Sequence, residues 1–171
     1  MTLLRRTLLA TPALLALPRP GAAQAFPSRP LRIVVPFAPG GAVDITARLL
    51  GEKLQPILGV NVVIDNRGGA GGNIGADAVA KAEPDGHTIL LGTATILAAN
   101  KFLYRRSMPF DPVRDLAPIT RVSTGTVLLV VNSQRPWRSF AELVAAAKAA
   151  PGRISMGSSG TGTVSHLTIS A

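Results

Sequence analysis

Short apolar runs alternate with amphipathic stretches along residues 31–103. The runs at 31–35, 60–64 and 88–91 are rich in Val, Ile and Leu, which is typical of buried parallel strands. Between them, apolar residues recur every three or four positions, as in helices with one buried face. The pattern predicts a β-α-β-α-β-α unit. Its helices are expected at about 42–58, 73–82 and 96–103.

The later part of the chain repeats the alternation less completely. A Pro- and Asp-rich connection follows at 107–118, and a helix is predicted at 139–149, where Ser139 and Glu142 have the spacing of a capping box. Further strands are predicted at 119–122, 127–132 and 154–156. The glycine-rich segment 157–162 then leads into a beginning helix.

This organisation predicts two domains. We expect a first α/β domain at 26–118, lacking a returning segment, and an incomplete second one at 119–171, because its last strand, loop and helix need partners. The alternative is a single complete domain with six strands.

The first 25 residues have the pattern of a secretory signal. Arg5 and Arg6 precede an apolar stretch at 7–17, and Ala23-Gln24-Ala25 is a small-x-small cleavage site. The stretch is too short to span a bilayer. We expect cleavage after Ala25 and a periplasmic location, by general or twin-arginine export. An amphipathic N-terminal helix is the alternative, but the segment contains no Asp, Glu or Lys.

The amino-acid composition excludes several classes of function. The chain has no Cys, which excludes disulfides, thiolate catalysis and Cys-ligated metals, and it has two His. Its 18 basic and nine acidic residues are consistent with a nucleic-acid or anionic-lipid partner. However, the basic residues are scattered and aromatic residues make up only 4%. We therefore expect no nucleic-acid partner.

Candidate chemistry follows the predicted strands. In an open parallel sheet, ligands bind beyond the carboxyl ends of the strands, at helix N-termini that attract anions. Gly40 and Gly41 follow the first strand, residues 69–73 follow the second, and Thr93 and Thr95 follow the third. Residues 158–163 would supply similar groups from the second domain. Such loops suit a small carboxylate or phosphate, although glycines between strands and helices are often only structural.

Three side chains near these loops are ambiguous. Asp44, in the first turn of its helix, would repel an anion, so helix stabilisation is favoured over ligand or water binding. His166 has an equal claim to ligand binding and to packing. His87 follows a turn and is expected to be exposed and without function.

Motifs for catalysis are incomplete. The Gly-x-Gly-x-x-Gly spacing fails after Gly69 and Gly71, no P-loop occurs, and residues 157–161 miss Gly-x-Ser-x-Gly at the last position. Ser158 or Ser159 with His166 would lack an acidic partner nearby. We predict no catalytic residue, no cofactor and no metal site.

Longer stretches carry a family resemblance. IVVPFAPGGAVDITARLL (33–50), DNRGGAGGNIGADAVAKAEPDGHTILLGT (65–93), FDPVRDLAPIT (110–120) and SSGTGTVSHL (158–167) resemble the Bug, or TctC-type, receptors of tripartite tricarboxylate transporters. The resemblance implies an α/β fold of the periplasmic-binding-protein type II-like class with two lobes. The second lobe is expected to be truncated here, because members of the family have about 300 residues after export. It implies a monomeric receptor that captures a small carboxylate, such as a di- or tricarboxylate or an acidic amino acid, for membrane components of the transporter. An exported α/β enzyme acting on a small organic acid is the alternative.

The same resemblance implies the binding residues. They would hold the ligand with backbone amides, hydroxyls and bridging waters, and they are Gly40, Gly41, Asp44, Ala70, Gly71, Gly72, Thr93, Gly160, Thr161, Thr163 and His166. Two departures concern the cleft. Gly68 stands where the family usually has proline, and residues 94–97 differ from the Thr-Gly-Thr-His segment of many members, which leaves the identity of the acid open.

Overall fold

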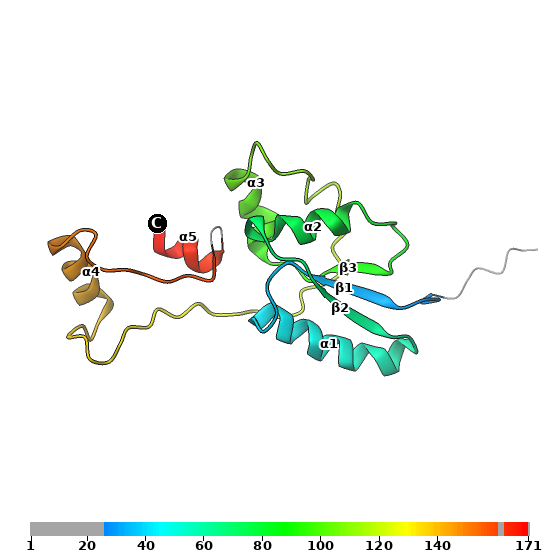
Figure 1. The fold of residues 1–171 in the computed structure, drawn as a ribbon, viewed down its shortest axis with the longest axis horizontal. Helices are drawn as coiled ribbons and strands as arrows, with labels where there is room; N and C mark the ends of the chain where they lie inside the picture. Colours follow the sequence, from blue (N-terminus) through cyan, green and yellow to red (C-terminus); the bar gives the residue numbers. More distant parts are fainter. Residues whose placement is uncertain (1–25, 161–162, 171) are drawn as a thin grey trace, which may run out of the picture.

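A three-stranded parallel sheet lies at the centre of the computed structural model, which describes residues 26–160 and 163–170 (Figure 1). The strand order is β2-β1-β3. The strands are β1 (Leu31–Val35), β2 (Val62–Asn66) and β3 (Thr88–Leu90). Ile33 of the middle strand is paired with Ile64 on one side and Ile89 on the other. The predicted parallel sheet is confirmed, with β2 beginning two residues later than expected.

Helices cover both faces of this sheet. Helix α1 (Ala42–Leu58) packs on one face, while α2 (Asn73–Ala80) lies on the other, beside the π-helical turn η3 (Thr95–Ala99) and the short α3 (Asn100–Leu103). Helix α1 ends as predicted, because Gly59 has a φ of 68° and its amide bonds the Gln55 carbonyl. Helix α2 ends two residues before the predicted boundary.

The core is divided between the two faces. Ile33, Val35 and Ala47 are buried between the sheet and α1, and Ala76, Ile96 and Phe110 are buried on the opposite side. Each buried Val or Ile side chain contributes about 1.5–3 kcal/mol. These two clusters fix the sheet between its helices, and the loops after the strands begin from this packed centre.

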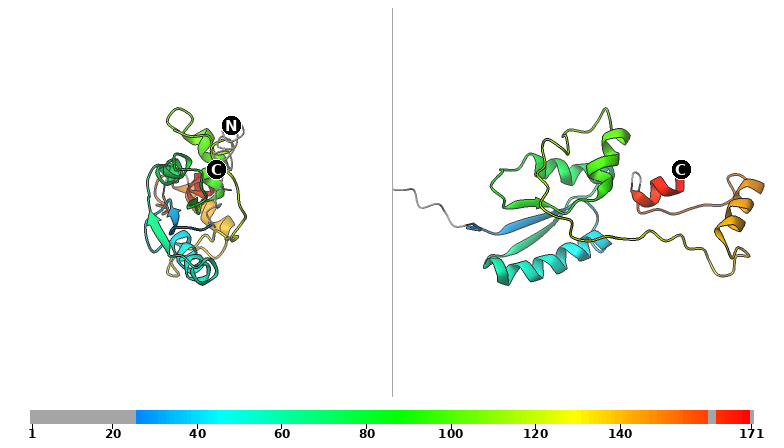
Figure 2. Two further views of the ribbon diagram at one scale, coloured as in Figure 1. Left: turned by 90° about the vertical axis from the view of Figure 1, so that its right-hand side faces the viewer. Right: turned by 180° about the vertical axis from the view of Figure 1, so that it is seen from behind.

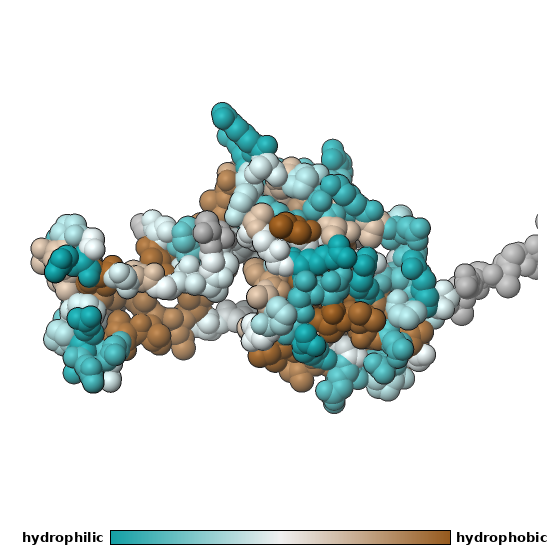
Figure 3. Space-filling view, in the orientation of Figure 1, coloured by the Kyte–Doolittle hydropathy of each residue, from teal (hydrophilic) through white to brown (hydrophobic). Residues whose placement is uncertain are grey.

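The strands predicted at 119–122, 127–132 and 154–156 are wrong. Residues 119–132 run as an extended segment with no partner strand, and Leu128 and Val130 are 77% and 82% exposed. A strand exists only where a neighbour pairs with its backbone, and the described residues offer none to this segment. Figure 3 shows apolar atoms along the segment that joins α4 to the sheet.

Helices form in this later region because their hydrogen bonds are local. Helix α4 (Phe140–Ala149) begins at Ser139, whose hydroxyl accepts from the Glu142 amide at 3.3 Å. The predicted cap is therefore confirmed, although the Glu142 carboxylate accepts from the amide of Arg138 and not of Ser139. Helix α5 (Val164–Ser170) follows the last glycine-rich loop.

His87 is buried, so the expectation of an exposed side chain is wrong. Its Nε2 accepts from the Ser28 amide at 3.2 Å, and the Phe26 ring packs edge-on at 5.0 Å between centroids. The turn at 84–86 is indeed exposed, but the segment before β1 covers the histidine. The predicted signal, residues 1–25, lies outside the described residues. Within the described ranges, no helix is long and apolar enough to cross a bilayer.

Candidate functional site

The loops after β1 and β2 lie side by side at the carboxyl edge of the sheet. The Arg67 amide donates to the Val35 carbonyl at 2.8 Å, and a Cβ placed on Gly68 would lie 3.5 Å from the Ala38 nitrogen. The pairing of Val35 with Asn66 explains this proximity, because it aligns the two strand ends. The predicted convergence of these two loops is therefore confirmed.

Asp44 holds the first loop in place. It is 2% exposed, and one carboxylate oxygen accepts from the Gly40 amide at 2.9 Å and from Arg48 Nε at 2.9 Å. The other oxygen accepts from Asn66 Nδ2 at 2.9 Å, and the same amide group also donates to the Phe37 carbonyl. The carboxylate thus connects the start of α1 to the end of β2.

These donors stabilise the charged form of Asp44. The Arg48 hydrogen bond, followed by the Gly40 and Asn66 hydrogen bonds, holds the pKa of Asp44 well below its ordinary value. The carboxylate therefore remains ionised at neutral pH, and its contacts give it a positioning role. A direct ligand contact for Asp44 stays a prediction.

The second loop has an unusual backbone. Gly69, Ala70, Gly71 and Gly72 have φ values of 124°, 48°, 64° and 93°, a region that favours glycine. Residues Ala70–Gly72 form a 3₁₀ turn, η2, which leads directly into α2. A side chain would not fit at Gly72, because a Cβ there would lie 2.5 Å from Ile96 Cδ1.

Backbone donors remain open on both loops. The Gly40 amide is used by Asp44, whereas the amides of Gly41, Ala70 and Gly71 bond no acceptor within the described residues. Each belongs to the start of a helical element, where the first amides have no intrahelical partner and the helix end is electropositive. This arrangement can bind an oxyanion without a buried cation.

Thr93 adds a hydroxyl beyond the third strand. Its Oγ1 is buried and has no hydrogen-bond partner in the described part of the chain, and its carbonyl accepts from the Leu97 amide at 3.2 Å. Thr95 is 5% exposed in the next helical turn. The structure thus places Thr93 after β3, as predicted, and with a free donor.

Of the predicted site residues of the later region, Gly160 and Thr163 lie just before α5, and His166 lies within it. Thr163 Oγ1 donates to the Gly160 carbonyl at 2.7 Å and accepts from the His166 amide at 3.4 Å. Figure 1 and the right-hand view of Figure 2 place α5 on the side toward which the strands point. Thr161 lies outside the described residues.

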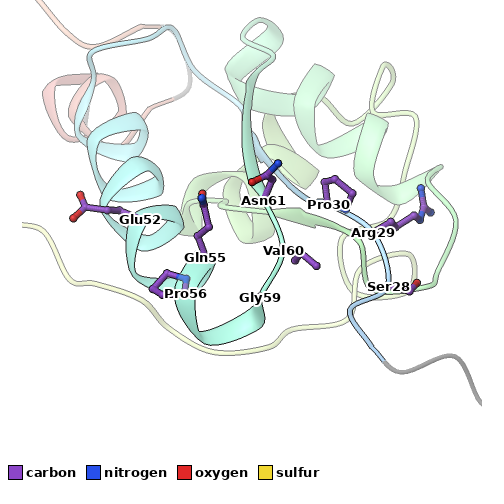
Figure 4. A pocket seen from close by; sticks show the side chains of 9 residues that line it. All are labelled: Ser28, Arg29, Pro30, Glu52, Gln55, Pro56, Gly59, Val60 and Asn61. Atoms are coloured by element: carbon purple, nitrogen blue, oxygen red, sulfur yellow. The ribbon is translucent and has the colours of Figure 1, made fainter.

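A hollow of about 700 Å³ opens at the opposite edge of the sheet, away from these loops. Figure 4 shows that it lies between the end of α1 and the segment before β1. Its polar side chains include Arg29, Glu52 and Gln55, of mixed charge. Opposite charges at one opening do not favour an anion, so this hollow is a weaker candidate site than the loops.

Sequence reasoning missed three residues that support the loops. They are Asn66, which bonds Asp44, Asn100, which bonds the Gly71 carbonyl at 3.0 Å, and Tyr104, which packs on Gly71. The amide of Asn66 at a strand end was a usable signal. Asn100 and Tyr104 lie about 30 residues from the loop, and no local pattern links them to it. No cluster of three metal-ligating side chains occurs in the described ranges.

Solved structures share this fold. MatC from Rhodopseudomonas palustris, solved with bound malate, has a TM-score of 0.67 and 35% sequence identity with this chain. The match covers 72% of this chain and 42% of MatC. Another R. palustris protein, solved with adipate, has a TM-score of 0.72 and 36% sequence identity with this chain. The match covers 84% of this chain and 48% of that protein. The periplasmic binding protein BugD has a TM-score of 0.61 and 37% sequence identity with this chain. The match covers 83% of this chain and 47% of BugD. The fold class is thus the periplasmic-binding-protein α/β class predicted from the sequence.

The family follows from the sequence comparisons. Residues 46–171 match the TctC family, described as the tripartite tricarboxylate transporter family receptor. A UPF0065 protein in the tcbD-tcbE intergenic region of a Pseudomonas species is 47% identical over 84% of this chain and 42% of its own length. The chain belongs to the TctC family of solute-binding receptors. It spans about half the length of the relatives and structures that it matches.

Proposed function

We propose that this protein is an extracytoplasmic receptor that captures a small carboxylate at the carboxyl edge of its sheet. The observation that carries the proposal is the pair of adjacent loops whose amides at Gly41, Ala70 and Gly71 bond no acceptor within the described residues. A carboxylate supplies two acceptor oxygens to such donors, and the helix ends favour its charge. Relatives solved with malate and with adipate support a di-acid as the ligand.

The remaining residues complete the proposed site. In this proposal Gly40 and Asp44 fix the first loop, Gly72 and Thr93 would contribute beside the second, and Gly160, Thr161, Thr163 and His166 would contribute from the later region. In this proposal, residues 26–118 form one lobe and residues 119–171 begin the other. The ligand would be held between them, partly through bridging waters.

The family suggests the wider role. We propose that the receptor is a periplasmic monomer, exported after cleavage behind Ala25, that delivers its ligand to membrane components of a tripartite tricarboxylate transporter. It performs no reaction on the ligand. An enzyme would convert a bound acid, so recovery of malate unchanged after prolonged incubation distinguishes a receptor from the enzymatic alternative.

Gly41→Val tests the first loop. Gly41 has an ordinary φ of −78°, and a Cβ there would lie 3.7 Å from the nearest atom, the Ala38 carbonyl oxygen. A Cβ therefore fits at this position, and we expect the branched side chain beyond it to shield the amide from a ligand. We expect loss of malate and adipate binding in calorimetry, with the melting temperature lowered by no more than a few degrees because valine is a poorer N-cap of α1 than glycine. Gly125→Val, in open space, is the control; retained affinity in Gly41→Val would remove this loop from the site.

The contribution of the later region is tested by comparing this chain with a full-length relative. If the ligand needs two complete lobes, malate or adipate should raise the melting temperature of the relative far more. A ligand at a hundred times its Kd stabilises a receptor by about 2.7 kcal/mol. Equal thermal shifts in both proteins would show that one lobe is sufficient.

A further inference from the structure

One face of the helical segment 95–104 lies against the glycine loop. Ile96, Asn100 and Tyr104 are spaced four residues apart, so they lie on one side of the segment. Ile96 contacts Gly72, and a Cβ on Gly71 would lie 3.0 Å from the Tyr104 hydroxyl. This face therefore supports the loop that we assign to ligand binding.

The loop does not hold its own conformation. Its four consecutive positive φ values are stabilised internally by only two backbone bonds among the described residues, from Gly72 to Gly69 and from Asn73 to Ala70. Fixing the backbone of one residue costs about 1–2 kcal/mol in entropy, and glycine loses the most freedom. Contacts from outside the loop must therefore select this conformation.

Asn100 supplies the polar part of that support. Its side chain is fully buried, and Nδ2 donates to the Gly71 carbonyl at 3.0 Å and to Asn73 Oδ1 at 2.7 Å. Both amide protons are used, one on the loop and one on the first residue of α2. The Gly71 carbonyl is thereby held toward the protein interior, while the amides of Ala70 and Gly71 bond no acceptor in the described chain.

We propose that Asn100 is a positioning residue of the binding site: its two hydrogen bonds fix the 69–72 loop in the conformation that presents amides to a carboxylate. Ile96 and Tyr104 pack on the same loop and exclude alternative arrangements. The inference rests on the proposed function, because it assigns the loop a ligand. The effect of Asn100 on the loop itself can be measured without any ligand.

The test uses Asn100→Ala and Asn100→Asp in the complete chain. The aspartate keeps the size of the side chain but cannot donate when ionised, so it separates the lost donor from lost volume. We expect the Gly72 amide to exchange with solvent about tenfold faster in both variants, and the Kd for malate or adipate to rise about three- to tenfold. Asn61→Ala, an exposed Asn far from the loop, should change neither quantity.

Each outcome decides the proposal. Unchanged Gly72 exchange together with unchanged affinity in the Asn100 variants would overturn it. If the unmodified chain binds neither acid while Asn100→Ala still accelerates exchange, the loop support stands and the proposal that this chain alone binds a carboxylate fails. If the variants do not fold, a scalar coupling across the hydrogen bond from Asn100 Nδ2 to the Gly71 carbonyl in the unmodified chain supports the proposal, and its absence contradicts it.

Discussion

Two similar apolar segments of this chain differ in burial. Leu31–Val35 (LRIVV) forms the central strand, in which Ile33, Val34 and Val35 are fully buried. Residues 127–131 (VLLVV) are more apolar still, yet every one of them is at least 44% exposed. The first segment has a strand on each side and helices on both faces, while the second has no partner strand in the described structure. Burial therefore depends on available partners and not on the sequence of the segment alone.

The largest expected effect on the free energy of unfolding comes from truncating a side chain in the buried segment 31–35, whereas the same change in the exposed segment 127–131 should have little effect. Ile33→Ala should lower the free energy of unfolding by about 2–5 kcal/mol, because it leaves a cavity between the sheet and α1. Leu128→Ala should change it by less than about 0.5 kcal/mol, since that side chain is 77% exposed. Urea unfolding followed by circular dichroism measures both. Equal losses would mean that residues 127–131 are buried in solution.

Close packing provides a second contrast. A Cβ on Gly75 would lie 2.9 Å from the Arg67 carbonyl oxygen and from Pro36 Cα, so Gly75→Ala should force α2 away from the sheet. We expect a loss of about 1–3 kcal/mol in the same unfolding assay. Gly125→Ala, with no atom within 4 Å, is the matched control in the extended region. A neutral Gly75→Ala would show that the contact between α2 and β1 is looser than described.

Acid should act on the sheet region through its hydrogen-bonded carboxylates. The Arg29 and His87-amide hydrogen bonds lower the pKa of Asp85 to about 2, and the pKa of Asp44 is lowered by Arg48, Gly40 and Asn66. Since the unfolded chain binds these protons first, stability is full above the ordinary Asp pKa of about 4 and falls as the pH drops toward 2. Thermal melts between pH 7 and pH 2 measure this.

A double substitution isolates that contribution. Asp44→Asn with Asp85→Asn should have lower stability at pH 7 and a flatter dependence below pH 4 than the original chain. If both proteins lose stability in parallel between pH 4 and pH 2, other carboxylates govern acid unfolding and the assigned hydrogen bonds are not its cause.

The smallest effect concerns a cap in the later region. Ser139→Ala removes the side-chain acceptor of the Glu142 amide and should cost α4 about 1 kcal/mol. Because α4 is remote from the sheet (Figure 1), the loss should appear as faster amide exchange at residues 140–143 and leave the exchange of β1 unchanged. Faster exchange in β1 would indicate that the two regions unfold together.

Local signals in the sequence predicted most elements of the fold. The branched run at 31–35, the stripe and C′ glycine of α1, and the Ser139 cap each depend on residues a few positions apart. The strands predicted at 119–122, 127–132 and 154–156 are wrong, because strand formation needs a partner distant in sequence. His87 failed for the same reason, since the segment at 26–28 covers it.

The candidate site was predictable only in part. The glycine-rich segments 40–41 and 69–72 marked both loops, since the positive φ of Gly40, Gly69, Gly71 and Gly72 favours glycine and Gly72 also lies too close to Ile96 for a Cβ. The contacts that shape the loops come from Asn66 and Asn100, 22 and 29 residues away from the groups they bond, Asp44 and Gly71. Asn66 could have been noticed because it ends a strand, but Asn100 carries no local mark of its role, and only the fold brings it to the loop.

The central claim is that backbone amides at the carboxyl edge of the sheet bind a small carboxylate. Titrating the isotope-labelled chain with malate and adipate while recording amide chemical shifts tests it most directly, because even millimolar affinity is detected. We predict shifts concentrated at Gly41, Ala70, Gly71 and Thr93. Shifts confined to the opposite hollow around Arg29, Glu52 and Gly59, or no shifts at any residue, would contradict the account.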